Sequence, residues 1–192
     1  MNGNFNTSAA EKNLPDILDY NLKVLFIGFN PGVLSAKTKH HYANKSNRFW
    51  RLLYESGLTP YRLDPVDDVK LLEYGYGSTN IVDSVTRLAS EIPANEYKKG
   101  SFELFELIKV LKPWIVCYVG IGVYREYASA ILNVSKNALK FNTGLQERSI
   151  IPEIMDFVCS NPSGLNTIQY SAQVECFAYL KKLIDALTKE RG

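Results

Sequence analysis

The chain has 192 residues, of which 46% are hydrophobic and 22% charged, and a formal net charge of +2. These values are typical of a soluble globular protein, and the length fits a single domain, 1–192, with a well-buried core. No apolar run approaches the roughly 18 residues needed to cross a membrane, and the N-terminus lacks a secretory pattern. We expect a monomer with no membrane partner, located in the cytoplasm (at the nucleoid or in the nucleus, according to its source), with a flexible segment at 1–13.

The cysteines give further limits. Cys117, Cys159 and Cys176 are far apart and odd in number, which favours reduced thiols over a disulfide framework. Three cysteines also do not supply a four-cysteine metal site or an iron–sulfur cluster. We therefore expect no metal and no cofactor, and we expect Cys159 to be a small buried residue rather than a nucleophile.

In chain order, apolar strand patterns alternate with helical patterns. This alternation predicts an α/β fold with a short, mainly parallel, four-stranded sheet covered on both faces. Residues 29–46 and 83–100 are expected to be loop or polar connection, and 133–153 irregular or hairpin-like. The expected strands are 23–28, 78–82, 114–119 and 157–160, and the expected helices are 46–57, 67–75, 102–111, 123–132 and 171–189.

The first strand leads directly into a polar side chain. Residues 24–27 are consecutively apolar, as in a strand buried on both faces. Pro31 moves Asn30 away from the helical conformation, and Gly32 lets a ligand approach the backbone closely. Because strands of open α/β sheets end at the crevice where ligands bind, Asn30 is predicted to be the chemical centre.

A second strand end has a similar signature. Asn161-Pro162 follows the strand expected at 157–160, as Asn30-Pro31 follows the first. Either Asn-Pro pair alone indicates only a turn. Since both loops leave the same edge of a parallel sheet, we predict that they line one composite site.

Basic residues gather around the first of these loops. No acidic residue lies between Asp19 and Glu55, a segment that also holds His40 and His41. Such a segment suits an anionic ligand or a phosphate backbone, although charge alone fits a solvated basic loop equally well. Two adjacent histidines without a third ligand favour phosphate or structural contacts over zinc. The basic residues are Lys23, Lys37, Lys39, Lys45, Arg48 and Arg51.

Together these motifs resemble those of a known family. From about residue 14 to 187 the chain is similar to the mismatch-specific uracil/thymine DNA glycosylases, a branch of the uracil-DNA glycosylase superfamily. The resemblance implies a three-layer α/β/α sandwich around the predicted sheet. The segments that carry it are GFNPG at 28–32, KHHY at 39–42, NRFW at 47–50, GYGSTNIVD at 75–83 and NPSGL at 161–165.

The resemblance implies roles for individual residues. Asn30 corresponds to the Asn that positions the attacking water beneath the deoxyribose C1′. Tyr42 corresponds to the aromatic residue that stacks on the flipped base, and Asn80 to a residue that bonds the polar edge of the base. The remaining residues implied in substrate binding are Phe29 beside the pocket, Ser35 close to the C5 side of a pyrimidine, and Asn161.

The resemblance also implies a DNA-contacting loop. Leu165 corresponds to an apolar wedge that enters the duplex where the base has left the stack. Some relatives carry an Arg two residues after this Leu, where this chain has Thr167, so contact with the opposite strand is expected to be weaker. The residues expected to contact DNA are Lys39, His41, Ser163, Gly164, Leu165 and Asn166.

The chemistry of these residue types agrees with base excision. A base inside a duplex must be flipped out at a cost of a few kcal/mol, which stacking and an inserted apolar side chain offset. An amide cannot deprotonate water and can only orient it, so the reaction depends on an oxocarbenium-like transition state. The expected function is a monofunctional glycosylase that removes uracil, and related damaged pyrimidines, from mismatched duplex DNA. Because thymine-active relatives have a smaller residue in place of Ser35, uracil is expected to be preferred.

Two other functions remain open at this point. The glycines and the basic loop also suit a nucleotide- or phosphate-binding α/β enzyme. Gly120 and Gly122 after a strand supply only part of a dinucleotide fingerprint, so this signal is weak. The second alternative is a module that flips bases without cleaving them. Release of free uracil from a duplex separates the three, because only a glycosylase leaves an abasic site.

Overall fold

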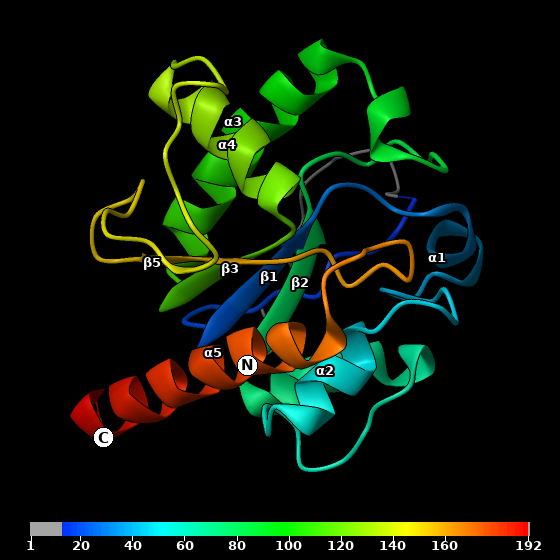
Figure 1. Ribbon diagram of the computed structural model, residues 1–192, viewed down its shortest axis with the longest axis vertical. Helices are drawn as coiled ribbons and strands as arrows, with labels where there is room; N and C mark the ends of the chain where they lie inside the picture. The colour runs from blue at the N-terminus through cyan, green and yellow to red at the C-terminus, as the bar shows by residue number, and fades with distance from the viewer. Residues whose placement is uncertain (1–12, 192) are drawn as a thin grey trace.

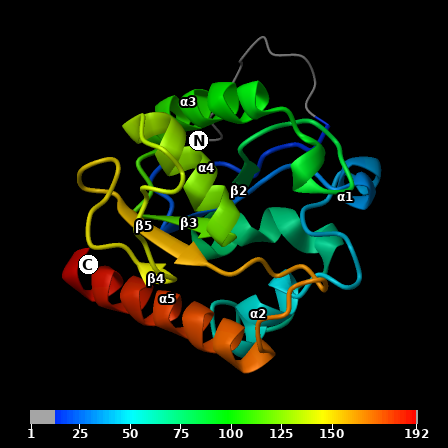
Figure 2. The same cartoon turned by 45° about the horizontal axis from the view of Figure 1, so that its top comes forward.

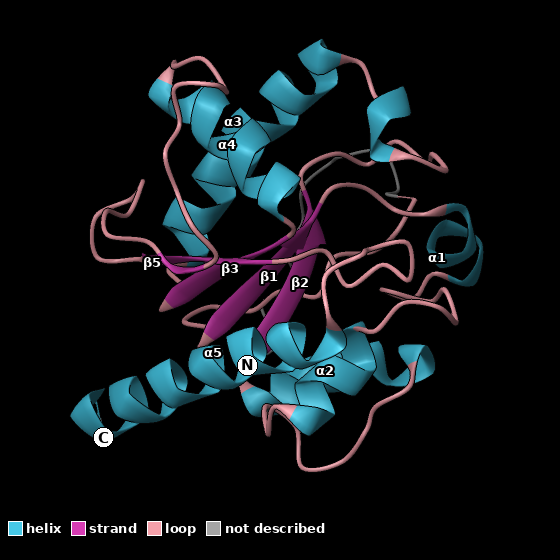
Figure 3. Cartoon of the chain, in the orientation of Figure 1, coloured by secondary structure: helices cyan, strands magenta, loops and turns pink. Residues whose placement is uncertain are grey.

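The computed structural model describes residues 13–191, and the flexible segment expected at 1–13 lies outside this range except for Asn13. Within the described residues one sheet is present, with strand order β2-β1-β3-β5-β4 (Figure 3). Strands β2, β1, β3 and β5 are mutually parallel, and β4 is antiparallel to β5. The strands are β1 (Val24–Gly28), β2 (Tyr76–Asn80), β3 (Ile115–Val119), β4 (Gly144–Leu145) and β5 (Met155–Cys159).

Helices cover both faces of the sheet. Helices α2 (Phe49–Glu55) and α5 (Tyr170–Arg191) lie on one face, and α3 (Ala94–Leu111) and α4 (Ile121–Leu132) on the other (Figures 1 and 2). None of the helices described is both long and apolar enough to cross a membrane. The shorter elements are α1 (Val33–Thr38), the 3₁₀-helix η1 (Pro65–Tyr74) and the 3₁₀ turn η2 (Ala89–Glu91).

The central strand β1 separates two apolar cores. All five of its residues are buried, as the apolar run predicts. Successive side chains of a strand point to opposite faces, so Val24 and Phe26 join the core under α2 and α5. Leu25 and Ile27 join the core under α3 and α4. This packing on both faces fixes the position of the strand end that leads to Asn30.

The structure corrects the fold expectation in several places. The sheet has five strands rather than four, because β4 adds an antiparallel pair at the edge. Two residues, Gly144–Leu145, are too few to show a periodic pattern. Residues 33–38, expected to be loop, form α1. The cap residue Gly32 has no side chain that could cap the helix, and the first turn holds no acidic residue. The usual start signals of a helix are therefore missing.

Helix α3 begins at Ala94, eight residues before the expected start. The expectation took 83–100 as a polar connection and began the helix at Phe102, and a glycine inside a helix costs about 1 kcal/mol relative to alanine. Here the glycine allows close packing, since a Cβ at this position would lie 2.0 Å from the carbonyl oxygen of Ile81. Gly100 therefore brings α3 against the chain that leaves β2, which is one side of the candidate site.

A buried carboxyl group in β5 makes stability depend on pH. Asp156 is 3% exposed; it accepts hydrogen bonds from the Tyr118 hydroxyl at 3.0 Å and from the Ile150 amide at 2.8 Å. Burial raises the pKa of Asp156 to about 6, above the unfolded value of about 3.9. The native state therefore holds this proton more tightly than the unfolded state.

We predict that this group lowers the free energy of unfolding as pH rises from about 4 to about 6, by an amount on the order of 3 kcal/mol. Below the unfolded pKa its contribution is fully present, and it is lost as pH passes the folded pKa. Asp156→Asn keeps the shape without titrating, so the difference in stability between variant and wild type should change over this interval. Urea unfolding at several pH values measures it, and parallel curves for the two proteins would contradict the assignment.

Candidate functional site

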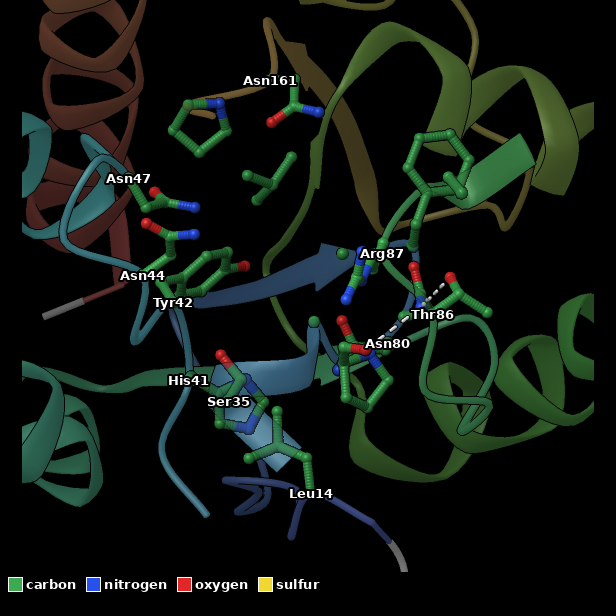
Figure 4. A pocket seen from close by; sticks show the side chains of 18 residues that line it. Leu14, Ser35, His41, Tyr42, Asn44, Asn47, Asn80, Thr86, Arg87 and Asn161 are labelled. Atoms are coloured by element: carbon green, nitrogen blue, oxygen red, sulfur yellow. Dashed lines mark hydrogen bonds between the residues drawn. The ribbon is translucent and has the colours of Figure 1, made fainter. Parts of the chain in front are cut away.

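A cavity of about 210 Å³ lies at the carboxyl ends of the parallel strands. Strand β1 lies between β2 and β3. The chain passes from β1 to β2 on one side and then crosses back to β3 on the other, and such a switch point in an open α/β sheet is where ligands bind. The cavity is lined by residues that end or follow β1, β2, β3 and β5 (Figure 4). Both Asn-Pro turns line it, so the structure brings the two predicted loops together.

The side chain of Asn30 is held in one orientation. Its Nδ2 donates to the Ser84 carbonyl at 2.9 Å, to Thr86 Oγ1 at 2.9 Å and to the Pro31 carbonyl at 3.1 Å. Carbonyl oxygens can only accept, so the nitrogen must face them and Oδ1 must point elsewhere. Among the described residues nothing donates to Asn30 Oδ1. This oxygen is therefore an acceptor of fixed orientation, and Asn30 itself lines the cavity.

Thr86 completes this orientation. Its hydroxyl donates to the Leu88 carbonyl at 2.9 Å, so the same oxygen is available as an acceptor toward Asn30. Ser84 and Thr86 lie 54 and 56 residues after Asn30 in a stretch that the sequence indicated only as polar. No local pattern predicts this pairing, which depends on the parallel register of β1 and β2.

Tyr42 forms one wall of the cavity. Its ring stacks on Phe49 with centroids 3.8 Å apart and planes at 19°, and the residue also lines the cavity. Phe49 is fully buried and meets Phe26 and Trp50 edge-on, so it anchors Tyr42 to the core. Tyr42 has a φ of +52°, which is rare for an aromatic residue and persists only when its surroundings impose it.

The side chain of Asn80 occupies space that a glycine leaves open. A Cβ at Gly28 would lie 2.5 Å from Asn80 Oδ1, and Gly28 and Asn80 are partners in the β1–β2 register. The side-chain amide of Asn80 makes no hydrogen bond with the residues that the structure describes. It therefore presents both a donor and an acceptor from the cavity wall.

Ser35 and Phe29 both line the cavity. Ser35 is 7% exposed, and its Oγ accepts a hydrogen bond from the Ala43 amide at 3.1 Å. Phe29 packs edge-on against Tyr97, and a Cβ on Gly122 would approach its ring to 2.6 Å. This close approach gives Gly122 a packing role that needs no dinucleotide.

The structure corrects the expected DNA contact of His41. The residue is 2% exposed; Nε2 lies 2.9 Å from the Pro15 carbonyl and Nδ1 3.0 Å from Ser78 Oγ. Since the carbonyl only accepts, Nε2 carries the proton and Nδ1 accepts from Ser78. Burial lowers the pKa of His41, which keeps the ring neutral. Both ring nitrogens are bonded inside the protein, so neither reaches a phosphate.

The remaining residues expected to contact DNA lie at the surface. Lys39 is exposed at the C-terminal end of α1. The loop 161–166 carries Leu165, which is 82% exposed. This loop packs against the basic segment between Asp19 and Glu55, since a Cβ at Gly164 would lie 2.7 Å from Ser46 Cβ. Arg87, which no motif indicated, lines both the cavity and the neighbouring groove that contains Leu165. In the same loop, Ser163 and Asn166 are half-buried, and Asn161, which was expected to bind substrate, is exposed.

A mainly parallel α/β sheet with a polar cavity at its topological switch point is typical of proteins that bind a nucleotide or a nucleic-acid base. The chain belongs to the uracil DNA glycosylase superfamily, whose family model matches residues 15–187. Members of this superfamily are hydrolases that act on DNA, which supports a DNA glycosylase role and DNA binding for this chain.

A solved structure shows the same fold. The chain is similar to a proposed uracil DNA glycosylase from Methanosarcina acetivorans, solved by NMR in solution, with a TM-score of 0.57. Sequence identity is 19%, over 88% of this chain and 96% of that one. At this identity the likeness concerns the fold alone.

The contact between Asn30 and Thr86 can be tested directly. Thr86→Val removes an acceptor for Asn30 Nδ2 while keeping the shape of the side chain, and a neutral hydrogen bond of this kind contributes about 0.5–1.5 kcal/mol. We expect single-turnover release of uracil to fall by about 3- to 10-fold with the melting temperature little changed. An unchanged rate would show that the Ser84 and Pro31 carbonyls alone hold the amide.

Proposed function

We propose that the protein is a monofunctional DNA glycosylase that flips uracil out of mismatched duplex DNA and hydrolyses its N-glycosidic bond. One observation carries the proposal: the Asn30 amide is fixed by its nitrogen, which leaves its oxygen as an acceptor, and Asn30 lines the same cavity as Tyr42. A base stacked on the exposed side of the Tyr42 ring would bring its sugar toward the acceptor that orients water.

The lining of the cavity supports a dissociative reaction. Its described residues include no carboxylate, and His41 is neutral with both nitrogens engaged. Burial also holds the pKa of the Tyr42 phenol well above its usual value. With no general base, catalysis depends on placing water beneath C1′ and on stabilising the departing base anion through fixed dipoles. Asn80, with an unused amide, is the residue proposed to bond the polar edge of the base.

Access to the base is proposed to depend on the loop 161–166. Flipping costs a few kcal/mol because it unstacks and unpairs the base, and an apolar side chain in the gap offsets part of this cost. Leu165, 82% exposed, has no packing role that would explain an apolar residue there. Phosphates on either side are proposed to meet exposed cations near the cavity, namely Lys37, Lys39, Lys45 and Arg87.

Uracil is proposed to be preferred over thymine. Ser35 is buried in the cavity wall, and its Oγ is held by the Ala43 amide, so the side chain cannot easily turn away from an added methyl group. One methyl in a pocket is worth about 1–3 kcal/mol of discrimination. Single-turnover rates on G·U and G·T duplexes measure this preference.

We predict that Asn30→Ala reduces uracil release by on the order of 100-fold or more, because the water loses its oriented acceptor. Affinity for a uracil-containing duplex should stay within a few-fold, since Asn30 is not a main binding group. Asn137→Ala is a matched control, as this exposed Asn lies between α4 and β4. Near-normal release by the Asn30 variant would overturn the assignment, and a wild type that leaves no abasic site would favour a nucleotide-binding enzyme or a non-catalytic module.

We predict that Tyr42→Ala weakens binding of the flipped base by about 1–3 kcal/mol, the usual contribution of base–aromatic stacking. Tyr42→Phe should bind normally, because the ring face makes the contact and the Phe49 stack remains. Titration with a duplex carrying a non-hydrolysable uracil nucleotide measures both variants. If Phe is as weak as Ala, the hydroxyl rather than the ring makes the essential contact.

A further inference from the structure

One fully buried polar side chain lies beneath the loop 161–166. Gln173, in the first turn of α5, is 0% exposed. Its Nε2 donates to Ser160 Oγ at 3.1 Å and to the Asn161 carbonyl at 3.0 Å. Its Oε1 accepts from Arg48 Nη1 at 3.0 Å. Gln173 thus joins the end of β5 to the residue that precedes α2.

Arg48 makes a second connection to the same loop. Its backbone amide donates to the Pro162 carbonyl at 2.9 Å, so Arg48 contacts the loop directly and also through Gln173. Together the two residues connect three segments that are far apart in the chain: the start of α2, the Asn161-Pro162 turn and the start of α5. In Figure 1 the loop passes close to α2 and the first turns of α5.

Packing alone does not account for a glutamine at this position. Among the described residues of α5, the other buried side chains are the apolar Phe177, Leu180, Ile184 and Leu187. A buried amide is costly unless its hydrogen bonds are made, and an apolar residue would continue the stripe without that cost. All of the hydrogen bonds of the Gln173 side chain go to Arg48, to Asn161 at the start of the loop, or to Ser160 immediately before it.

We propose that Gln173, with Arg48, is a positioning residue that holds the loop 161–166 in the conformation in which Leu165 enters the duplex. The inference rests on the proposed function, because it assigns Leu165 the role of a wedge. A loop fixed before binding loses little conformational freedom when DNA binds. Without Gln173 the loop has to become ordered in each binding event, and base pairs that are hard to open are affected most.

The test uses Gln173→Met, which keeps the length of the side chain and removes its hydrogen bonds. Gln169→Met is the matched control, because Gln169 is exposed one turn earlier. Hydrogen exchange reports on the loop without any activity: the Asn166 amide, bonded to the Ser163 carbonyl at 2.9 Å, should exchange about 10-fold faster or more in the Gln173 variant. Amides near the C-terminal end of α5 should be unchanged.

The second measurement is single-turnover release of uracil from A·U and G·U duplexes. We expect the A·U rate to fall on the order of 10-fold and the G·U rate by no more than about 3-fold, because a mispaired base costs less to extrude. In a Leu165→Ala background, Gln173→Met should cause no further loss, since both changes act on the same step. Arg48→Met should shift both rates in the same direction by a smaller factor, and it provides the test if the Gln173 variant does not fold.

The outcomes separate the two proposals. Unchanged exchange at Asn166 overturns the positioning role, whatever the activity. Faster exchange with equal losses on A·U and G·U, or additive losses with Leu165→Ala, shows that Gln173 stabilises the fold without acting on the wedge and also overturns it. Absence of uracil release by the wild type contradicts the proposed function instead, and the exchange measurement then still decides whether Gln173 holds the loop.

Discussion

The parallel register of β1 and β2 is the constraint on which the site depends. It pairs Gly28 with Asn80 and continues into a bridge between Gly32 and Thr86, so that the Asn30 amide meets Thr86 and the Asn80 side chain lies over a glycine. A slip of one residue would turn every β2 side chain to the other face of the sheet and would remove both contacts together. The two apolar cores bury alternate residues of β1. They therefore fix the positions of Asn30 and Asn80 as well as the fold.

Within this frame the only charged side chain among the described residues of the cavity wall is that of Arg87, which is exposed. The described lining has no carboxylate, its one histidine is neutral, and its tyrosine stays protonated. Positive charge lies at the surface, on exposed side chains such as Lys39, Lys45 and Arg87, of which Arg87 also lines the cavity. This separation suits a ligand with an anionic backbone and an uncharged base: the cations attract the backbone, while fixed dipoles act on the base without a buried charge that would need a partner.

Local patterns predicted the parts of the molecule that local chemistry determines. The apolar run before Asn30 and the two Asn-Pro turns were indicated by residue type and spacing, and the structure places them accordingly. Helix α1 and strand β4 were missed because neither has a capping signal or a periodic pattern. The partners of Asn30 and the enclosure of His41 depend on segments brought together only by folding, so no short window of sequence contains them.

Under the proposed function, the buried contacts that hold the loop 161–166 compensate for a DNA contact that the chain lacks. The family resemblance implies an Arg two residues after the wedge in some relatives, where this chain has the exposed Thr167. Without that charge, under the proposed function, opening a base pair depends more on the position of Leu165 itself. A wedge that makes few contacts with DNA is effective only if it is already oriented when it arrives. The buried Gln173 and its bonds to Arg48, Ser160 and Asn161 supply that orientation from inside the protein, where salt and competing phosphates do not reach it.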